Sequence, residues 1–509
     1  MFLLEGLRMS QFYAGIANVE KNAALNGFQC TPVPGAVSEA EAGIVNRLVS
    51  LWRDKYEKNR VKTAYFNCEQ EIKNLNVSLP SDFARRCRAR VGWCAKAVKS
   101  LADFTVYDGL DGIPEDSPVY ALQAVNDLES VISQAVTSAY KHGFSLLTVY
   151  RGLSGAAKVQ ARSALSSSAI WDFESQTIKS AFTITGYDSE GRVTSFCVFV
   201  PGAILQFANI DGDWTVKRVA TLPGIVTAVP IVYDPQLDRP FGRSRITKAL
   251  RSYTDMAVRT LVRMEASAEF YSVPKLWFLG LDPEAMSGDG WNSLISQINA
   301  ISRDEDGNTA SPYQVQQASM SPHAEMLRTL ALLAASETNL PASDLGVNMA
   351  VPQSAEALAE AERKLTREAD RQNSLYSKAV KQALVCAAKL DVSVNTNPQT
   401  MEDAARLRVL FKPTQEQSVG ARGDMFAKIA ANVPSYVSTV QAWRSLGFSD
   451  EDALAILREV RKDNALSFLE RAANSGGSVS TVAKNATVAE NSAVAENATT
   501  ESASIGSEE

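Results

Sequence analysis

Apolar residues recur at helical spacing through much of the chain, and the clearest run predicts a helix over residues 354–391. No glycine or proline interrupts it, so at about 1.5 Å per residue it would form a rod of about 54 Å. Ser354 is a suitable N-cap, and Glu356 places a carboxylate near the positive end of the helix dipole. The apolar stripe, with one polar member, consists of Leu358, Ala361, Leu365, Ala369, Gln372, Tyr376, Ala379, Ala383, Ala387 and Leu390.

A loop over residues 340–353 precedes this helix, and a second helix over residues 319–339 leads into the loop. Pro341 and Pro352 bound the loop, because a proline fits neither helix interior. Most residues between the two prolines are apolar, so the loop needs a packing partner. That partner is either the same subunit or another copy of the chain.

A further helix is predicted from Ile246 to about Tyr271. Charged residues spaced by four form a separate face of it, and Asp255 is placed to pair with the arginines on either side. Upstream, helices are predicted over 36–60, from Ser81 to about 101, and over 119–142. The charged face consists of Arg251, Asp255, Arg259 and Arg263.

The pattern changes to period two after Gly143, where five segments alternate apolar and polar residues as far as Ala220. They predict an antiparallel sheet of about five strands, with turns at 188–191 and 211–213. Asp211 and Asp213 resemble half a calcium loop, but the strand that follows them favours a hairpin turn. The predicted strands are SLLTVYR, KSAFTITGY, RVTSFCVFV, AILQFAN and WTVKRVA.

Two regions flank these elements with patterns of their own. Residues 273–318 contain a strand-like KLWFLGL, a short helix near 291–301 and the segment YQVQQ. Residues 396–472 predict several further helices, including one over MEDAARLRVLF. From about residue 473 the chain repeats TVAKNA, TVAENS and AVAENA without aromatic residues, which predicts disorder.

Composition excludes several classes of protein. A chain of 509 residues is too long for one core, and no apolar window is long enough to predict a transmembrane helix. No signal peptide is expected, and six cysteines without CxxC spacing predict reduced thiols. With only His142 and His323, a histidine metal site or a Ser-His-Asp triad is not expected. The net charge of −6 argues against a phosphate clamp, and no P-loop motif is present, so neither catalytic residues nor cofactors are predicted.

Four strings between about residues 40 and 410, in the same order, resemble the portal proteins of tailed bacteriophages with long non-contractile tails. The first is the Leu-x-Val-x-Leu-Pro segment at 75–80, followed by Val91-Gly92-Trp93 and Asp108-Gly109. The second is Val229-Pro230, and the third is Gly242-x-Ser244-x-Ile246 at the start of a helix. The fourth joins Leu345-Gly346 to Ser354-Ala355-Glu356-Ala357-Leu358.

The resemblance implies an α+β, portal-like subunit. It would have a wing of helices plus an antiparallel sheet, a helical stem, a small α/β clip, a long helix and a helical crown. The implied segments are an N-terminal arm and wing (1–242), a stem helix (243–272), a clip (273–318), a second stem helix (319–339), a tunnel loop (340–353), a long wing helix (354–391), a crown (392–472) and a disordered tail (473–509).

The resemblance also implies a function that is not enzymatic. Twelve subunits would form a ring at one capsid vertex, nucleate head assembly and conduct double-stranded DNA during packaging and ejection. Partners would be the terminase large subunit, a head-completion or adaptor protein, and the scaffolding and major capsid proteins, with no membrane. The protein would lie in the virion, and in the host cytoplasm during assembly. The implied channel residues are Asp344, Leu345, Gly346, Val347, Asn348, Met349, Ala350 and Val351, with Arg251, Asp255, Arg259 and Arg263 in the stem.

Two other functions agree with the same composition. A metal-dependent nucleic-acid-processing enzyme would bring aspartate and glutamate side chains together in a pocket. A cytosolic helical scaffold protein would have similar long helices but would remain a monomer. Converging carboxylates would favour the first alternative, and a monomer in solution would favour the second.

Overall fold

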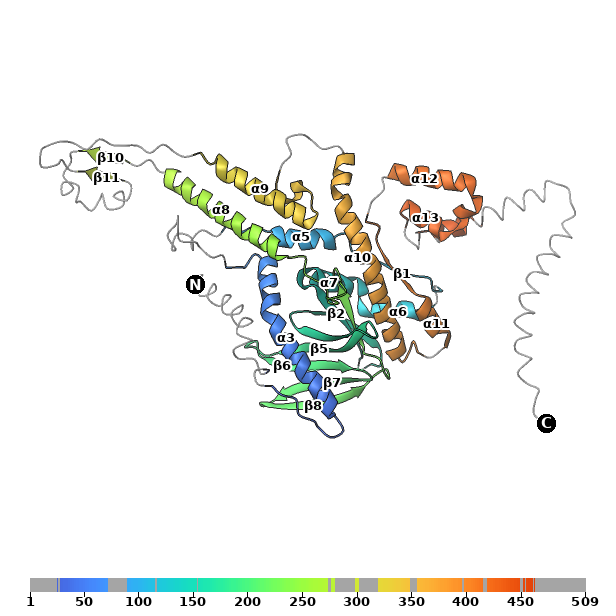
Figure 1. Cartoon of the computed structure of the whole chain (residues 1–509). Coiled ribbons are helices and arrows are strands. Elements are labelled where there is room, and N and C mark those ends of the chain that lie inside the picture. Colours follow the sequence, from blue (N-terminus) through green and yellow to red (C-terminus); the bar gives the residue numbers. More distant parts are fainter. Residues whose placement is uncertain are drawn as a thin grey trace, which may run out of the picture. The chain divides into compact units, whose positions relative to one another are not determined.

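The computed structural model describes most of the chain, which divides into two compact units, residues 1–414 and 415–509 (Figure 1). The described residues are 25, 28–71, 89–114, 117–152, 154–272, 276–279, 298–301, 319–347, 355–395, 398–414 and 419–448, with shorter pieces at 452–453, 455–460 and 462.

Two antiparallel sheets form the centre of the first unit. The predicted five-stranded sheet exists, but its membership differs from the prediction, because the first predicted strand belongs to the second sheet. That strand pairs on both sides, with Leu147 opposite Ala161 in one neighbour and opposite Val229 in the other. The three-stranded sheet has the order β3 (Ala157–Ser163), β2 (Phe144–Arg151), β9 (Ala228–Val232), and the five-stranded sheet runs β4 (Ser167–Asp172), β5 (Thr177–Tyr187), β6 (Val193–Val200), β7 (Ala203–Ile210), β8 (Asp213–Ala220).

The five-stranded sheet is covered by helix α3 (Glu39–Phe66), which confirms the predicted N-terminal helix and extends it (Figure 1). A capping box between Ser38 and Glu41 fixes its start. Trp52 of the helix and Phe182 of β5 are both buried, and their ring centroids lie 6.0 Å apart. The 211–213 segment is the predicted hairpin turn between β7 and β8, with Gly212 at a φ of 101°.

Two shorter helices, α6 (Val119–Asn126) and α7 (Leu128–His142), pack on the three-stranded sheet, and α5 (Trp93–Ala102) packs on α7. The helix predicted from Ser81 to about 101 is wrong at 89–92, which are not helical, and α5 begins at Trp93; residues 72–88 lie outside the described part. A second prediction was also wrong. The single helix predicted over 119–142 is broken at Asp127, which adopts a φ of 46°.

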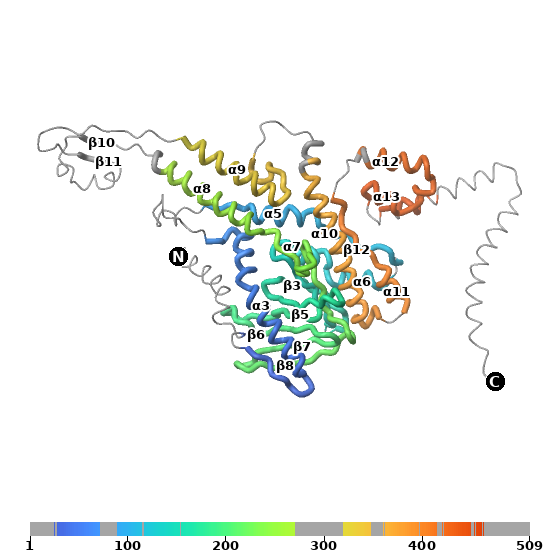
Figure 2. Tube along the Cα trace, viewed as in Figure 1, coloured from blue at the N-terminus to red at the C-terminus, as the bar shows by residue number. Residues whose placement is uncertain are grey.

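The two predicted stem helices are present and pack against each other (Figure 2). They are α8 (Lys248–Ser272) and α9 (Ser321–Thr338). Between them, β10 (Leu276–Leu279) and β11 (Ile298–Ile301) form a parallel pair. The prediction of a short helix near 291–301 was therefore wrong at its end, where Ile-Asn-Ala-Ile forms a strand. The YQVQQ segment lies outside the described residues.

Helix α10 (Ala355–Leu390) confirms the long predicted helix and packs against β2, β3, β9 and β12 (Figure 1). Its predicted stripe is buried where described, from Leu365 to Leu390, except Ala379, which is partly exposed. Helix α11 (Pro398–Arg406) follows. The helix predicted over MEDAARLRVLF was wrong at its end, because β12 (Arg408–Phe411) pairs with β1 (Tyr107–Asp111).

The second unit is helical in its described part, as predicted. Phe426 and Trp443 pack with ring centroids 5.8 Å apart. Its helices are α12 (Val419–Asn432), η4 (Pro434–Ser438) and α13 (Val440–Leu446), and the described positions from 452 to 462 are also helical. The tail over 473–509 lies outside the described residues. Among the helices that the structure describes, none has the length and apolar character needed to cross a bilayer.

Candidate functional site

The first half of the predicted tunnel loop packs against its own subunit. Residues Ala342–Leu345 form the short 3-10 helix η3, which contacts α5 and α9. Leu345 and Val347 are 8% and 6% exposed and belong to the main core. Asp344 lies 3.5 Å from the Lys96 ammonium, and Gly346 adopts a φ of 85° with open space around it. This half of the loop therefore packs inside its own subunit, which is one of the two alternatives given above. Residues 348–351 lie outside the described part.

The four predicted stem residues lie on α8, but the expected ion pairs are absent. The Tyr65 hydroxyl of α3 donates to both carboxylate oxygens of Asp255, at 2.9 and 2.8 Å. Arg251 lies over the Tyr65 ring, 5.6 Å from its centroid. Within the described part of the chain, neither Arg251 nor Arg259 forms an ion pair with Asp255. Arg251 and Asp255 of α8 therefore contact Tyr65 of α3 instead of pairing with each other.

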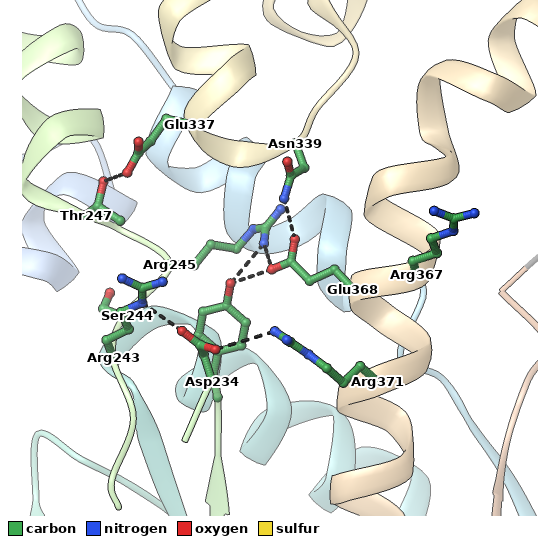
Figure 3. A pocket seen from close by; sticks show the side chains of 11 residues that line it. Asp234, Arg243, Ser244, Arg245, Thr247, Glu337, Asn339, Arg367, Glu368 and Arg371 are labelled. Atoms are coloured by element: carbon green, nitrogen blue, oxygen red, sulfur yellow. Dashed lines mark hydrogen bonds and ion pairs between the residues drawn. The ribbon is translucent and has the colours of Figure 1, made fainter. Parts of the chain in front are cut away.

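A buried arginine lies where both stem helices meet the long helix α10. Arg245 precedes α8, and its side chain is 3% exposed. Its Nε donates to the Ala97 carbonyl of α5 at 2.6 Å, and Nη2 donates to the Thr338 carbonyl at the end of α9 at 2.5 Å. Nη1 donates to Glu368 of α10 and, at 3.2 Å, to the Tyr233 hydroxyl just after β9 (Figure 3). One guanidinium group therefore joins four segments that are distant in sequence.

Glu368 completes this arrangement, which we call the stem junction (Arg245, Glu368, Tyr233, Thr338 and Asn339). The Tyr233 hydroxyl donates to its Oε1, and the Asn339 amide donates to its Oε2 at 3.1 Å. Burial raises the pKa of Tyr233, and the Glu368 carboxylate adds to that effect, so the hydroxyl stays protonated as a donor. The pair is largely desolvated and every charged group in it has partners, which is the condition under which a buried ion pair is tolerated.

The chain before Arg245 is shaped by a glycine and a serine from the Gly-x-Ser-x-Ile string. Gly242 has a φ of 60°, and a Cβ there would lie 1.9 Å from the Tyr233 carbonyl oxygen, so no larger residue fits. The Ser244 hydroxyl donates to the Lys141 carbonyl at 2.6 Å and accepts from the Ile246 N–H at 3.0 Å. These contacts hold the turn against α7 and aim the next side chain, Arg245, inward.

An open cavity of about 380 Å³ lies beside the stem junction (Figure 3). The Asp234 carboxylate forms ion pairs with Arg243 Nε at 2.7 Å and with Arg371 Nη2 at 3.4 Å. The Thr247 hydroxyl donates to Glu337 at 2.7 Å, which links α8 to α9 a second time. The carboxylates here alternate with arginines and do not converge, so this cavity does not resemble a metal-dependent active site.

Metal-binding chemistry has no visible basis in the described ranges. Across these residues, no three His, Cys, Asp or Glu side chains gather in a way that could hold an ion. His142 is buried with Thr63 3.0 Å from its Nε2, and burial lowers its pKa, so it stays neutral. The described contacts of the stem junction link the helices to one another mechanically.

Sequence reasoning missed the junction residues although it singled out their neighbours. Arg245 stands between Ser244 and Ile246 of the recognised string, and Glu368 adjoins Ala369 of the apolar stripe. A charged residue next to a helix's buried face was the available signal. It did not identify the partner, because the two residues are 123 positions apart.

Comparison with known proteins gives a family and several relatives. The model of a family described as phage portal protein, SPP1 Gp6-like, matches residues 88–460, more than half of the chain. The portal protein of Mycobacterium phage D29 is 25% identical over 82% of this chain and 88% of the relative, and that of Mycobacterium phage L5 is 24% identical over the same shares. A chain from the neck of an empty gene transfer agent particle has a TM-score of 0.41 at 14% identity, covering 74% of this chain and 93% of that one, which is too weak to carry an argument.

Proposed function

The chain belongs to the SPP1 Gp6-like family of phage portal proteins and has that family's function, and we propose from this premise how its parts perform it. The family match carries the assignment, because it spans both stem helices and the long helix. We expect a ring at one capsid vertex that nucleates head assembly, docks the terminase motor and an adaptor protein, and conducts double-stranded DNA. The ring is expected to have twelve subunits.

Ring assembly agrees with the apolar residues that one subunit leaves exposed. On α9, Leu332 and Leu333 are each 45% exposed, although α8 and η3 cover another side of that helix. A neighbouring subunit would bury these side chains at a favourable free energy of about 25 cal/mol per Å².

Electron microscopy of the purified full chain tests this assembly directly. We expect closed rings with a central channel. The single variant Leu333→Glu should weaken them, while Glu325→Gln, an exposed change on the same helix, should leave them intact. A monomer at micromolar concentration would contradict the proposal and favour the alternative of a helical scaffold protein.

The stem would give the channel a fixed wall. Helices α8 and α9 pack along each other, and the stem junction fastens both to α10. The Thr338 carbonyl held by Arg245 lies two residues before the predicted tunnel loop. The loop would therefore leave the wall from an anchored point.

The constriction of the channel is proposed for the second part of the loop, residues 348–351, because Leu345 and Val347 are occupied in the subunit core. Small apolar and amide groups such as those of Asn348, Met349 and Ala350 would touch DNA without gripping its phosphates. Leu345 and Val347 would serve as the anchor of the loop rather than as its tip.

A deletion of residues 348–351, with Leu345 and Val347 retained, tests this assignment. Rings should form normally, while DNA packaging or retention in heads should fail. The matched control is Val347→Ala, which should weaken folding by about 1–2 kcal/mol but leave packaging by folded rings intact. If the deletion variant packages DNA normally, residues 348–351 do not form the channel constriction. The family assignment would be unaffected by that result.

A further inference from the structure

A stripe of mostly polar and charged residues follows one side of α3. Arg47, Leu51, Lys55, Asn59 and Lys62 recur every three to four residues and line the same cavity. From Arg47 to Lys62 the stripe extends about 22 Å at the helical rise. Three of its five members are cations, so this wall of the cavity is strongly positive.

A second part of the cavity lining is aromatic. Phe241 packs 5.1 Å from Phe144 and 5.9 Å from Trp171, measured between ring centroids. Ser168 and Ala169 of β4 are buried and also line the cavity. The cavity measures about 660 Å³, enough for several amino-acid side chains. We call this space, between the α3 stripe and the three aromatic rings, the wing groove.

The cations that α3 contributes to the wing groove have no counter-charge among the described residues. Arg47 and Lys55 form no ion pair in the part of the chain that the structure describes. Lys62 donates to neutral acceptors, the His142 carbonyl at 2.8 Å and the Asn59 amide oxygen at 3.3 Å. Asp238 also lines the groove, but it lies 3.6 Å from Arg239 of the same lining. The groove therefore has an unbalanced positive charge.

Two further groups are energetically unsatisfied. The Trp171 indole nitrogen is buried and has no acceptor among the described residues, and an indole N–H can only donate. The pKa of Lys62 is lowered to about 8, first by burial and then by the nearby charges of Arg251, Lys55 and Lys58. An anion in the groove would relieve this repulsion, and a carbonyl oxygen would accept from the indole.

We propose that the wing groove binds an acidic peptide segment of a protein partner that carries large apolar side chains. Its carboxylates would lie along Arg47, Lys55 and Lys62, and an apolar side chain would pack against Phe144, Trp171 and Phe241. A main-chain carbonyl would accept from the Trp171 indole. This binding is separate from DNA conduction and does not depend on the tunnel loop.

Double-stranded DNA is the less suitable polyanion for this surface. A duplex keeps its bases stacked inside the helix and presents phosphates to the cations, so it makes no use of a recessed aromatic wall. The apolar side chains of a peptide use that wall, and their burial adds free energy that a phosphate backbone would not gain. Competition by an oligonucleotide separates the two.

Fluorescence anisotropy tests the proposal with the assembled full chain. The probe is a labelled synthetic peptide in which glutamates alternate with leucine and phenylalanine. We expect saturable binding that weakens about tenfold in Lys55→Glu and in Arg47→Glu, because each reverses one unpaired charge. Peptides with glutamine for glutamate, or serine for leucine and phenylalanine, should each bind more weakly than the probe.

Lys217→Glu is the matched control, since it reverses the same charge at an exposed lysine of β8 that does not line the groove. It should bind the probe as the unmodified chain does, and circular dichroism should report the same secondary structure for all variants. No saturable binding by the unmodified chain, an equal loss in Lys217→Glu, or displacement of the probe by an oligonucleotide at lower concentration would each overturn the proposal.

Discussion

The stem junction and the wing groove both contain cationic side chains, but they differ in how these are paired. The junction gives its arginine a carboxylate, whereas the cations that α3 contributes to the groove have no carboxylate partner among the described residues. At the junction, all three guanidinium nitrogens of Arg245 donate to acceptors, and Glu368 lies against it. In the groove, Arg47 and Lys55 have no ion pair within the described chain. A buried charge without a partner costs several kcal/mol, whereas an exposed one costs little. Paired buried charges thus fix the architecture, and unpaired exposed charges remain free to bind another molecule.

The largest effect is expected at the junction. Arg245→Met leaves the Glu368 carboxylate without its cation in a largely buried place, so it should lower the free energy of unfolding by about 3–5 kcal/mol. Urea unfolding followed by tryptophan fluorescence measures this loss. The double variant Arg245→Met/Glu368→Leu should recover part of it, because no uncompensated charge remains. If the double variant is less stable than the single one, the junction depends on shape rather than on charge.

Periodicity predicted the elements that are long and have one buried face. The helix stripe from Leu365 to Leu390 is one such case, and the alternation in β5 to β8 is another. It failed where a single residue interrupts a regular pattern: Asp127 breaks the predicted helix through its positive φ while the apolar spacing continues. β3, with the sequence AKVQARS, was missed because its alternation is weak and only Ala157 and Val159 are buried.

The site was predictable only in part, for a similar reason. The Gly-x-Ser-x-Ile string drew attention to Gly242 and Ser244, whose roles are local and geometric. Arg245 and Glu368 are needed because they pair with each other in the folded chain. They are far apart in sequence, so no local spacing relates them. The same holds for the wing groove, where α3 provides three cations, and β2, β4 and the segment before α8 each provide one aromatic ring.

The second prediction disturbs the junction without touching its charges. Gly242→Ala would place a Cβ 1.9 Å from the Tyr233 carbonyl oxygen, so the backbone must shift. With the added strain of a positive φ, we expect a loss of about 2–3 kcal/mol in the free energy of unfolding. Gly212→Ala is the control, because its φ is also positive but nothing lies within 4 Å, and it should cost only about 1 kcal/mol. Equal losses would mean that conformational strain, not the close approach, makes Gly242 necessary.

The third prediction concerns Lys62, whose folded pKa of about 8 lies below the ordinary value of 10.5. Between these values the unfolded chain binds more protons than the folded chain, so stability rises with pH there. Below about pH 8 the full penalty of the buried charge is present. Lys62→Met should therefore have its greatest stability relative to the unmodified chain near pH 7, and this advantage should shrink as pH rises to about 10. Thermal unfolding at several pH values measures the trend, and a difference that does not change with pH would contradict it.

The smallest expected effect on stability is at Lys55, which is exposed, lines the wing groove and has no ion pair in the described ranges. Lys55→Met removes no partner and leaves no charge buried alone, so its free energy of unfolding should stay within about 0.5 kcal/mol of the unmodified value. Removing one like charge near Lys62 should also raise the Lys62 pKa slightly. Peptide binding should nevertheless weaken, because the substitution deletes a charge that folding does not use. A loss of stability comparable to that of Arg245→Met would show that Lys55 stabilises the fold. It would contradict the distinction between the stem junction, whose charges stabilise the fold, and the wing groove, whose charges do not.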